Sequence, residues 1–446
     1  MIEQKIQAGH KRSPKTKTLP LAGIQILDMT SVMLGPYATQ MLGDYGADIV
    51  KIESPSGDTT RWTGPTPESG MAATFMGVNR SKRSVVLDLK KPSGREVLLK
   101  LAETADVLIY SVRPQKMIAL GLGPESLHAR NPQLIIVGVH GFAEGGPYAG
   151  KPAYDDIIQG LCGLSALTEI QSGEPAYLPT VVADKTCGLF ATQAILMGLI
   201  GRSRSDEGAC IEVPMFEAMT SFTLAEHLYG GHFTPAIQGY GYDRLTTRFR
   251  RPYRTTDGFI CMVPYTNEHW RRFFIEVGEP ALSDDPRFTN ISARTENIDC
   301  LYSIVGEHLS RRSTEEWLAT CERLDIPVAR MNRLEDLEQD PHLVATGFFQ
   351  RMKDDRMGDI KTPRPALRFD QNTPIPTMPP RLGEHTAQVL QEAGLSATSI
   401  EALLSEGAAV QWEPGNTAHR QPKTKIQNCL EPLAPVSNQP VIKPGK

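Results

Sequence analysis

Short apolar runs recur through the first third of the chain, each separated from the next by a stretch with helical spacing. Runs of this kind, bounded by turn residues, are typical of strands buried on both faces of a sheet. The predicted strands span residues 23–29, 47–53, 84–89, 106–111 and 134–139. Helices are predicted between them at 35–45 and 92–104, with further helical turns at 114–130. This alternation predicts the α/β class, with βαβ units and a parallel sheet covered by helices on both faces.

The pattern changes in the middle of the chain. Residues 184–228 have helical spacing, except for a polar turn at 203–208 and a short extended piece at 211–214. An irregular connection rich in glycine, tyrosine and arginine follows. One strand and three helices come next, predicted at 257–263, 269–277, 298–309 and 314–324. Ser313 and Glu316 have the capping-box spacing that starts the last helix. This block predicts a second, smaller α+β domain.

Composition excludes several classes of function. Of the 446 residues, 40% are hydrophobic and 22% charged, and the formal net charge is -4, which gives no general attraction to nucleic acid or an anionic membrane. The seven cysteines have no CxxC pairs and the histidines no metal-ligand spacing, so we expect neither disulfides nor a metal site. The basic N-terminus has no apolar core of a secretory signal, and no apolar run is long enough to span a membrane. We expect a cytoplasmic protein.

The first strand–helix junction argues against a nicotinamide or flavin cofactor. A dinucleotide-binding fold carries GxGxxG there, because the backbone must approach the pyrophosphate closely. The junction here, residues 30–36, contains a single glycine, Gly35. We therefore expect no permanently bound cofactor.

Carboxylates stand at the start of two predicted helices. Asp155 and Asp156 follow Tyr154, and Asp184 precedes a nearly all-apolar helix. An acid in such surroundings is costly to desolvate, so it is usually either paired or used in chemistry. Helix capping is the alternative interpretation for each of these residues.

Several separated motifs together resemble the class III CoA-transferases. This family includes formyl-, carnitine- and glutarate-CoA transferases as well as alpha-methylacyl-CoA racemases. The resemblance covers residues 19–404 and depends on the segments 21–28, 35–36, 43–53, 57–61, 79–84, 141–148, 154–155 and 183–188. No single motif is decisive, but their order and spacing make coincidence improbable.

The resemblance implies a large Rossmann-like domain built from both ends of the chain, with the small domain inserted. It also implies an interlocked homodimer with active sites near the interface. The expected divisions are a disordered leader (1–18), the large domain (19–225), the small α+β domain with linkers (226–330), a return to the large domain (331–410) and a disordered tail (411–446).

The resemblance also implies a chemistry, in which Asp184 matches the family's nucleophilic aspartate. The reaction moves CoA from an acyl-CoA thioester to a free carboxylic acid through an aspartyl anhydride and an aspartyl-CoA thioester. Asp155 matches the acidic position beside the active site. Tyr154 stands where racemases have histidine, and a tyrosine is a poor proton shuttle near neutral pH. The alternatives are an acyl-CoA racemase or isomerase and a non-catalytic CoA-binding protein.

Substrate-binding residues follow from the same resemblance. CoA carries phosphates, so we expect cations near the surface of the first domain to bind them. The candidates are Arg61, Arg80, Lys82, Arg83 and Arg113. Val32 and Met33 lie where family members line the thioester pocket.

Arg251 and Arg254 belong to an arginine-rich connection, and fixed guanidinium groups suit a second carboxylate. We therefore expect a dicarboxylic acid, with succinyl-CoA as a possible donor. The alternative is that these two arginines contact the partner subunit or the CoA phosphates.

Overall fold

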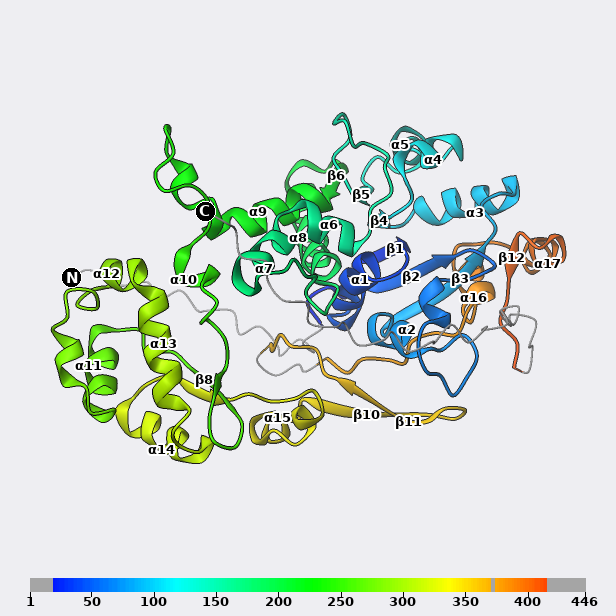
Figure 1. Cartoon of the computed structure of the whole chain (residues 1–446). Coiled ribbons are helices and arrows are strands. Elements are labelled where there is room, and N and C mark those ends of the chain that lie inside the picture. The colour runs from blue at the N-terminus through cyan, green and yellow to red at the C-terminus, as the bar shows by residue number, and fades with distance from the viewer. Residues whose placement is uncertain (1–18, 370–373, 415–446) are drawn as a thin grey trace, which may run out of the picture.

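The computed structural model describes residues 19–369 and 374–414 (Figure 1). The predicted leader (1–18) and the predicted tail beyond residue 414 lie outside the described residues. Residues 411–414 of the predicted tail (411–446) are described, and the Trp412 N–H donates to the Gly383 carbonyl at 3.1 Å.

A seven-stranded sheet forms the centre of the larger body, in the order β12-β3-β2-β1-β4-β5-β6. The strands are β1 (Gln25–Met29), β2 (Asp48–Glu53), β3 (Lys82–Leu87), β4 (Val107–Tyr110), β5 (Ile135–His140), β6 (Ala209–Pro214) and β12 (Ala409–Val410). All neighbours are parallel except β12, which pairs antiparallel with β3. The predicted α/β class is thus confirmed, and the sheet is mixed because of β12. Without β12, the strand order is that of doubly wound nucleotide-binding folds.

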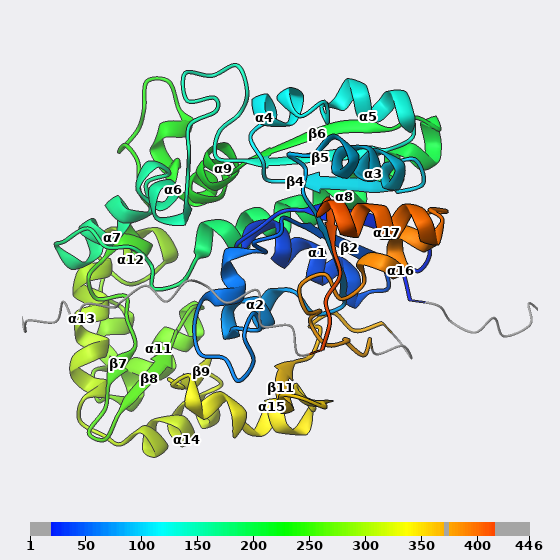
Figure 2. The ribbon, with the colours of Figure 1, turned by 90° about the vertical axis from the view of Figure 1, so that its right-hand side faces the viewer.

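Helices cover both faces of this sheet (Figure 2). One face packs against α1 (Leu34–Asp44), α6 (Asp155–Leu161), α8 (Val182–Ser205) and α9 (Met215–His227). The other packs against α3 (Pro92–Ala102), α4 (Pro114–Ala119), α5 (Pro124–Arg130), α16 (Thr386–Glu392) and α17 (Ala397–Glu406). Alternation along each strand supplies both cores: Ile26 packs into the first and Leu27 into the second.

A smaller body has its own, largely aromatic core. Its antiparallel sheet consists of β7 (Tyr253–Arg254), β8 (Phe259–Met262) and β9 (Val328–Arg330). Its main helices are α11 (Asn267–Glu276), α12 (Ile291–Glu296), α13 (Ile298–Leu309) and α14 (Thr314–Leu324). The predicted capping box at Ser313 and Glu316 is confirmed. The core residues, from Tyr253 to Ile326, fall within the predicted small-domain range, while the domain boundaries remain predictions.

The chain then returns to the larger body (Figure 1). The return contains α15 (Pro341–Ala345) and a hairpin of β10 (Phe349–Asp354) and β11 (Gly358–Pro363). The Tyr45 hydroxyl donates to the Leu367 carbonyl at 2.9 Å, so this segment is attached to the end of α1.

Some short elements were not predicted from the sequence. They are α2 (Ala73–Val78), α7 (Leu164–Ser172), α10 (Asp243–Thr246), α12, α15, β7 and β12. A two-residue strand such as β12 carries no measurable periodicity, because its existence depends on the partner strand β3. The strand predicted at 84–89 begins two residues earlier, at Lys82, which brings that lysine into the core.

Candidate active site

A cavity of about 370 Å³ opens at the carboxyl ends of β1, β4 and β5. Its lining includes Val32 and Met33 after β1, Arg113 after β4 and His140 at the end of β5. The strand order reverses between β1 and β4, since β2 and β3 lie on one side and β5 and β6 on the other. In open α/β sheets, ligands bind at this switch point, outside the carboxyl ends of the strands. The fold therefore favours this cavity as a ligand site.

Asp184 lines the same cavity from the first turn of α8. Burial, together with the nearby Asp155 carboxylate, raises the pKa of Asp184 to about 7. Within the described residues, no cation pairs with the Asp184 side chain, and its hydrogen bond to Asp155 uses the backbone N–H. The side chain is thus a half-buried carboxylate that faces a cavity and changes its ionisation near neutral pH.

Asp155 lies behind Asp184 rather than in the cavity lining. Its Oδ1 accepts the Asp184 N–H at 2.9 Å, and its Oδ2 accepts from Gln159 Nε2 at 2.6 Å. Gln159 Oε1 in turn accepts the Leu178 N–H at 2.9 Å. The α8 N-cap residue, Val181, supplies no capping side chain, so Asp155 on α6 caps this helix from outside.

Tyr154 stands at the mouth of the cavity, with 70% of its surface exposed. Its position at the N-cap of α6 brings it next to Asp155, although its hydroxyl is not used for capping. The structure therefore brings Tyr154, Asp184, Val32 and Met33 together in one cavity, and their roles in a reaction remain predictions.

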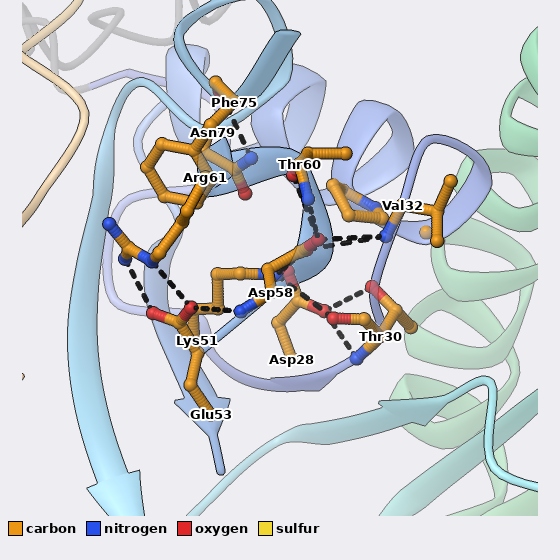
Figure 3. A network of polar contacts seen from close by, with 12 residues as sticks. Asp28, Thr30, Val32, Lys51, Glu53, Asp58, Thr60, Arg61, Phe75 and Asn79 are labelled. Atoms are coloured by element: carbon orange, nitrogen blue, oxygen red, sulfur yellow. Dashed lines mark hydrogen bonds and ion pairs between the residues drawn. The ribbon is translucent and has the colours of Figure 1, made fainter. Parts of the chain in front are cut away.

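The prediction of surface cations is wrong for Arg61, Arg80 and Lys82. These side chains are buried and form ion pairs at 2.6 Å with Glu53, 2.8 Å with Asp44 and 3.2 Å with Asp28, respectively. A buried cation that already has its anion cannot reach a CoA phosphate without leaving an unpaired charge in the core. Figure 3 shows the Arg61–Glu53 pair, whose two side chains are both buried.

The other two predicted cations differ from each other. Arg83 is half-buried and pairs with Asp48 and Glu392, away from the cavity lining. Arg113 lines the cavity, is exposed and donates only to the Gly150 carbonyl, at 3.3 Å, among the described residues. Of the five candidates, Arg113 is the one that faces the site.

Arg251 and Arg254 lie in the smaller body and do not line the cavity of Asp184. Arg254 stacks on the Phe259 ring, with its guanidinium carbon 5.0 Å from the ring centre, and both arginines are exposed. Within this chain, the structure does not bring them to the other predicted site residues.

Three cavity residues with titratable side chains were missed from the sequence: His140, Glu144 and Lys151. Their position could have identified them, because they follow the end of a buried strand in a parallel sheet, where ligands bind. Burial lowers the pKa of His140 to about 4, so its imidazole is neutral at physiological pH.

Cys187, three residues after Asp184, is a competing nucleophile by residue type. It is fully buried in α8, and burial, with the nearby carboxylates, raises its pKa to about 12. A thiol that stays protonated is a weak nucleophile, so Cys187 belongs to the packing of α8 against the sheet.

Neither a metal site nor a membrane span is found in the described part of the chain. Residues 19–369 and 374–414 contain no cluster of three or more His, Cys, Asp or Glu suited to a metal ion. In the same residues, no helix is long and apolar enough to cross a membrane.

Comparison with known proteins gives the family. The family model for CoA-transferase family III matches residues 21–386. The chain is 30% identical over 412 residues to human succinyl-CoA:glutarate CoA-transferase, covering 91% of this chain and 93% of that protein. It is 32% identical over 393 residues to the succinate–glutarate CoA-transferase of Agrobacterium fabrum, covering 84% of this chain and 95% of that protein.

A solved structure has a similar fold. The crystal structure of Rv3272 from Mycobacterium tuberculosis matches with a TM-score of 0.72 and 28% identity, covering 83% of this chain and 99% of that chain. The chain therefore belongs to CoA-transferase family III, and it is a class III CoA-transferase.

Proposed function

We propose that this transferase moves CoA from an acyl-CoA donor to a free carboxylic acid with Asp184 as its covalent nucleophile. The supporting observation is the Asp184 carboxylate, which lines the cavity at the switch point of the sheet and has no cationic partner among the described residues. Buried carboxylates with structural roles here, such as Asp28 and Glu53, are paired with cations. An unneutralised carboxylate in a cavity is suited to nucleophilic attack.

In the proposed first half-reaction, an Asp184 carboxylate oxygen attacks the thioester carbonyl carbon of the donor. The carbon–sulfur bond breaks and its electron pair leaves with sulfur, which gives a mixed anhydride on Asp184 and the CoA thiolate. The thiolate then attacks the side-chain carbonyl carbon of Asp184. This attack releases the donor as a free carboxylate and leaves an aspartyl-CoA thioester.

The second half-reaction runs the same steps with the acceptor acid. The acceptor carboxylate attacks the aspartyl thioester and expels CoA thiolate, and the thiolate attacks the acceptor's acyl carbon to regenerate Asp184. No net proton is transferred. Because every intermediate is an activated acyl group, exclusion of water preserves the free energy of the thioester.

We propose succinyl-CoA as the donor and a dicarboxylate of the glutarate type as the acceptor. The human relative is named for succinyl-CoA and glutarate, and the Agrobacterium relative for succinate and glutarate. The cavity lining has two cations, Arg113 and Lys151, which suit a second carboxylate or a CoA phosphate. Incubating the enzyme with succinyl-CoA and a panel of acids, with mass spectrometry of the CoA esters, identifies the acceptor.

The role of Arg251 and Arg254 in carboxylate binding remains a proposal. Both arginines lie in the smaller body, so the role requires either domain closure or a partner subunit. Arg251→Ala and Arg254→Ala are expected to raise the KM for the free acid while leaving the KM for the donor unchanged. An unchanged KM for the acid would contradict the assignment.

We also propose the interlocked homodimer. The outer face of α8 exposes Leu189, Met197 and Ile200, and an apolar cavity of about 510 Å³ lies between α1, α8 and residues 363–369. Exposed apolar area of this kind is typical of an interface. Light scattering is expected to give twice the chain mass, and an active monomer would contradict the proposal.

Trapping tests the nucleophile directly. Hydroxylamine added during incubation with succinyl-CoA is expected to convert Asp184 to a hydroxamate, detected by peptide mass spectrometry. Asp184→Asn should lose both the modification and transfer. Asp156→Asn, at an exposed acid on α6, is the matched control and should keep both. Full transfer activity in Asp184→Asn would overturn the proposed role.

Racemisation is the alternative within this fold. The observation against it is Tyr154 at the position where racemases have histidine. Incubation of an acyl-CoA in deuterium oxide distinguishes the two. Deuterium at the alpha carbon without CoA transfer would favour the racemase.

A further inference from the structure

Val32, in the cavity lining, has an unusual backbone conformation. Its φ is 70°, in the left-handed region, and its side chain is β-branched. Such a residue is a genuine outlier, because the branched Cβ crowds the backbone there. Strained residues of this kind persist only where the surrounding structure holds them, and they concentrate at functional sites.

Asp58 is the group that holds Val32. The Val32 N–H donates to both Asp58 oxygens, each at 3.2 Å (Figure 3). Asp58 is itself buried, and Lys51 Nζ lies 3.0 Å from its Oδ2. Its Oδ1 also accepts the Thr60 N–H at 3.0 Å and the Thr60 hydroxyl at 2.8 Å. Four donors therefore converge on one carboxylate.

The same network also holds Thr30, two residues before Val32. Lys51 Nζ donates to the Thr30 carbonyl at 2.9 Å, and the Thr30 N–H donates to Asp28 Oδ1 at 2.9 Å. Asp28 in turn pairs with the buried Lys82. The segment 30–33 is thus held at two points by buried charges that do not themselves line the cavity.

We propose that Asp58 is a positioning residue for the transfer reaction. By holding Val32 in the left-handed conformation, it sets the position of Val32 and Met33 in the wall of the cavity that also contains Asp184. The ion pair with Lys51 keeps Asp58 ionised and in place. The role of Asp58 in catalysis rests on the proposed use of the cavity for acyl transfer. Its effect on the conformation of Val32 does not.

Asp58→Asn is the test variant. The amide keeps one oxygen but replaces the other with a donor, so the four converging donors lose half of their acceptors. The matched control is Asp44→Asn, which breaks a comparably buried ion pair, at 2.8 Å to Arg80, beside the 510 Å³ cavity and outside the lining of the Asp184 cavity. Asp58→Ala is avoided, because it removes both oxygens and leaves all four donors, Lys51 Nζ included, without this acceptor.

The first measurement is hydrogen–deuterium exchange of the peptide that contains Val32. Asp58→Asn is expected to accelerate exchange there, and Asp44→Asn is not. Equal protection in native protein and Asp58→Asn overturns the inference, whatever the activity. This measurement needs no assumption about the reaction, so it also distinguishes failure of this inference from failure of the proposed function.

The second measurement is kinetic. In Asp58→Asn, kcat/KM for the acyl-CoA donor is expected to fall by about 10²-fold, as misplacement of a pocket wall by about 1 Å does elsewhere. Asp44→Asn should change it by much less at a similar loss of thermal stability. Equal kinetic losses in the two variants would show a merely structural role.

Val32→Gly supplies a variant that does not threaten folding. Glycine adopts positive φ without steric cost, so the protein with Val32→Gly depends less on Asp58. Asp58→Asn is therefore expected to cost less activity when combined with Val32→Gly than when introduced alone. Additive losses in this double-mutant cycle overturn the coupling.

Discussion

Asp184 combines two properties that usually exclude each other. It is a half-buried carboxylate, and the charged group that shifts its pKa is another carboxylate, Asp155. Both effects disfavour the charged form and bring its pKa to about 7. The helix N-terminus and the hydrogen bond from its own N–H to Asp155 hold it in place instead. The residue is thus positioned by its backbone, which leaves its side chain available.

Titration of Asp184 predicts the pH dependence of the reaction. Only the carboxylate attacks a thioester, so we expect the single-turnover rate of enzyme acylation to rise with pH through about 7. In Asp155→Asn the neighbouring charge is lost, and the midpoint should move to lower pH. The measurement is a stopped-flow or quench-flow rate measured from acidic to alkaline pH on both sides of that midpoint. The same midpoint in both proteins would contradict the electrostatic role of Asp155.

At the level of elements, the contact between α1 and α8 positions two groups of cavity residues relative to each other: Val32 and Met33, just before α1, and Asp184 on α8. Gly188, one turn after Asp184, faces the start of α1. A Cβ at this position would lie 2.9 Å from the Leu34 carbonyl and 3.1 Å from the Tyr37 ring. Leu34 directly follows Met33, which lines the cavity. The absence of a side chain at residue 188 therefore lets α8, which carries Asp184, lie close to the segment that carries Met33.

Gly188→Ala is therefore expected to destabilise the protein, by about 1–3 kcal/mol, despite the better helix propensity of alanine. It should also lower kcat/KM, because α1 must move away from α8. Gly201→Ala on the same helix is the control, since nothing lies within 4 Å of its Cβ position. That variant should be more stable, by about 0.5–1 kcal/mol, with normal activity. Chemical denaturation and steady-state kinetics measure the two effects, and equal effects in both variants would contradict this account.

At the level of the whole molecule, buried ion pairs tie the first three strands together. Asp28 on β1, Lys51 and Glu53 on β2, and Lys82 on β3 meet in the interior with Asp58. Burial alone would raise the pKa of Asp28, but Lys82, Lys51 and two hydroxyl donors outweigh it and hold the pKa at about 2. These ion pairs therefore form only in the folded protein, and they require ionised carboxylates.

This network predicts an acid-sensitive component of stability. Because the folded pKa of Asp28 is below its unfolded value of 3.8, its contribution is present above about pH 4 and lost as pH falls towards 2. It amounts to about 2 kcal/mol. Urea unfolding at neutral pH and at successively lower pH should show this loss, and Asp28→Asn should flatten it. An unchanged pH dependence in Asp28→Asn would locate the acid sensitivity elsewhere.

The sequence by itself determined the class of fold and the position of the nucleophile candidate. Strand and helix periods are local, so the first five strands and three helices of the smaller body, α11, α13 and α14, were predictable within a few residues. The motif around Asp184 was also local. Short elements such as β12 were not predictable, because a two-residue strand is stabilised by its neighbour rather than by its own residues.

Only the tertiary structure decided which charged side chains face the cavity and which form buried ion pairs. A cation looks the same in sequence whether it faces solvent or a buried anion, and Arg80 meets Asp44 across 36 residues. Asp155 reaches Asp184 across 29 residues and becomes the cap of a helix to which it does not belong. Burial and pairing set the energy of a charge, and both arise when distant segments pack together. The same packing separates Arg113, which faces the cavity, from the buried cations that hold the cavity wall in place.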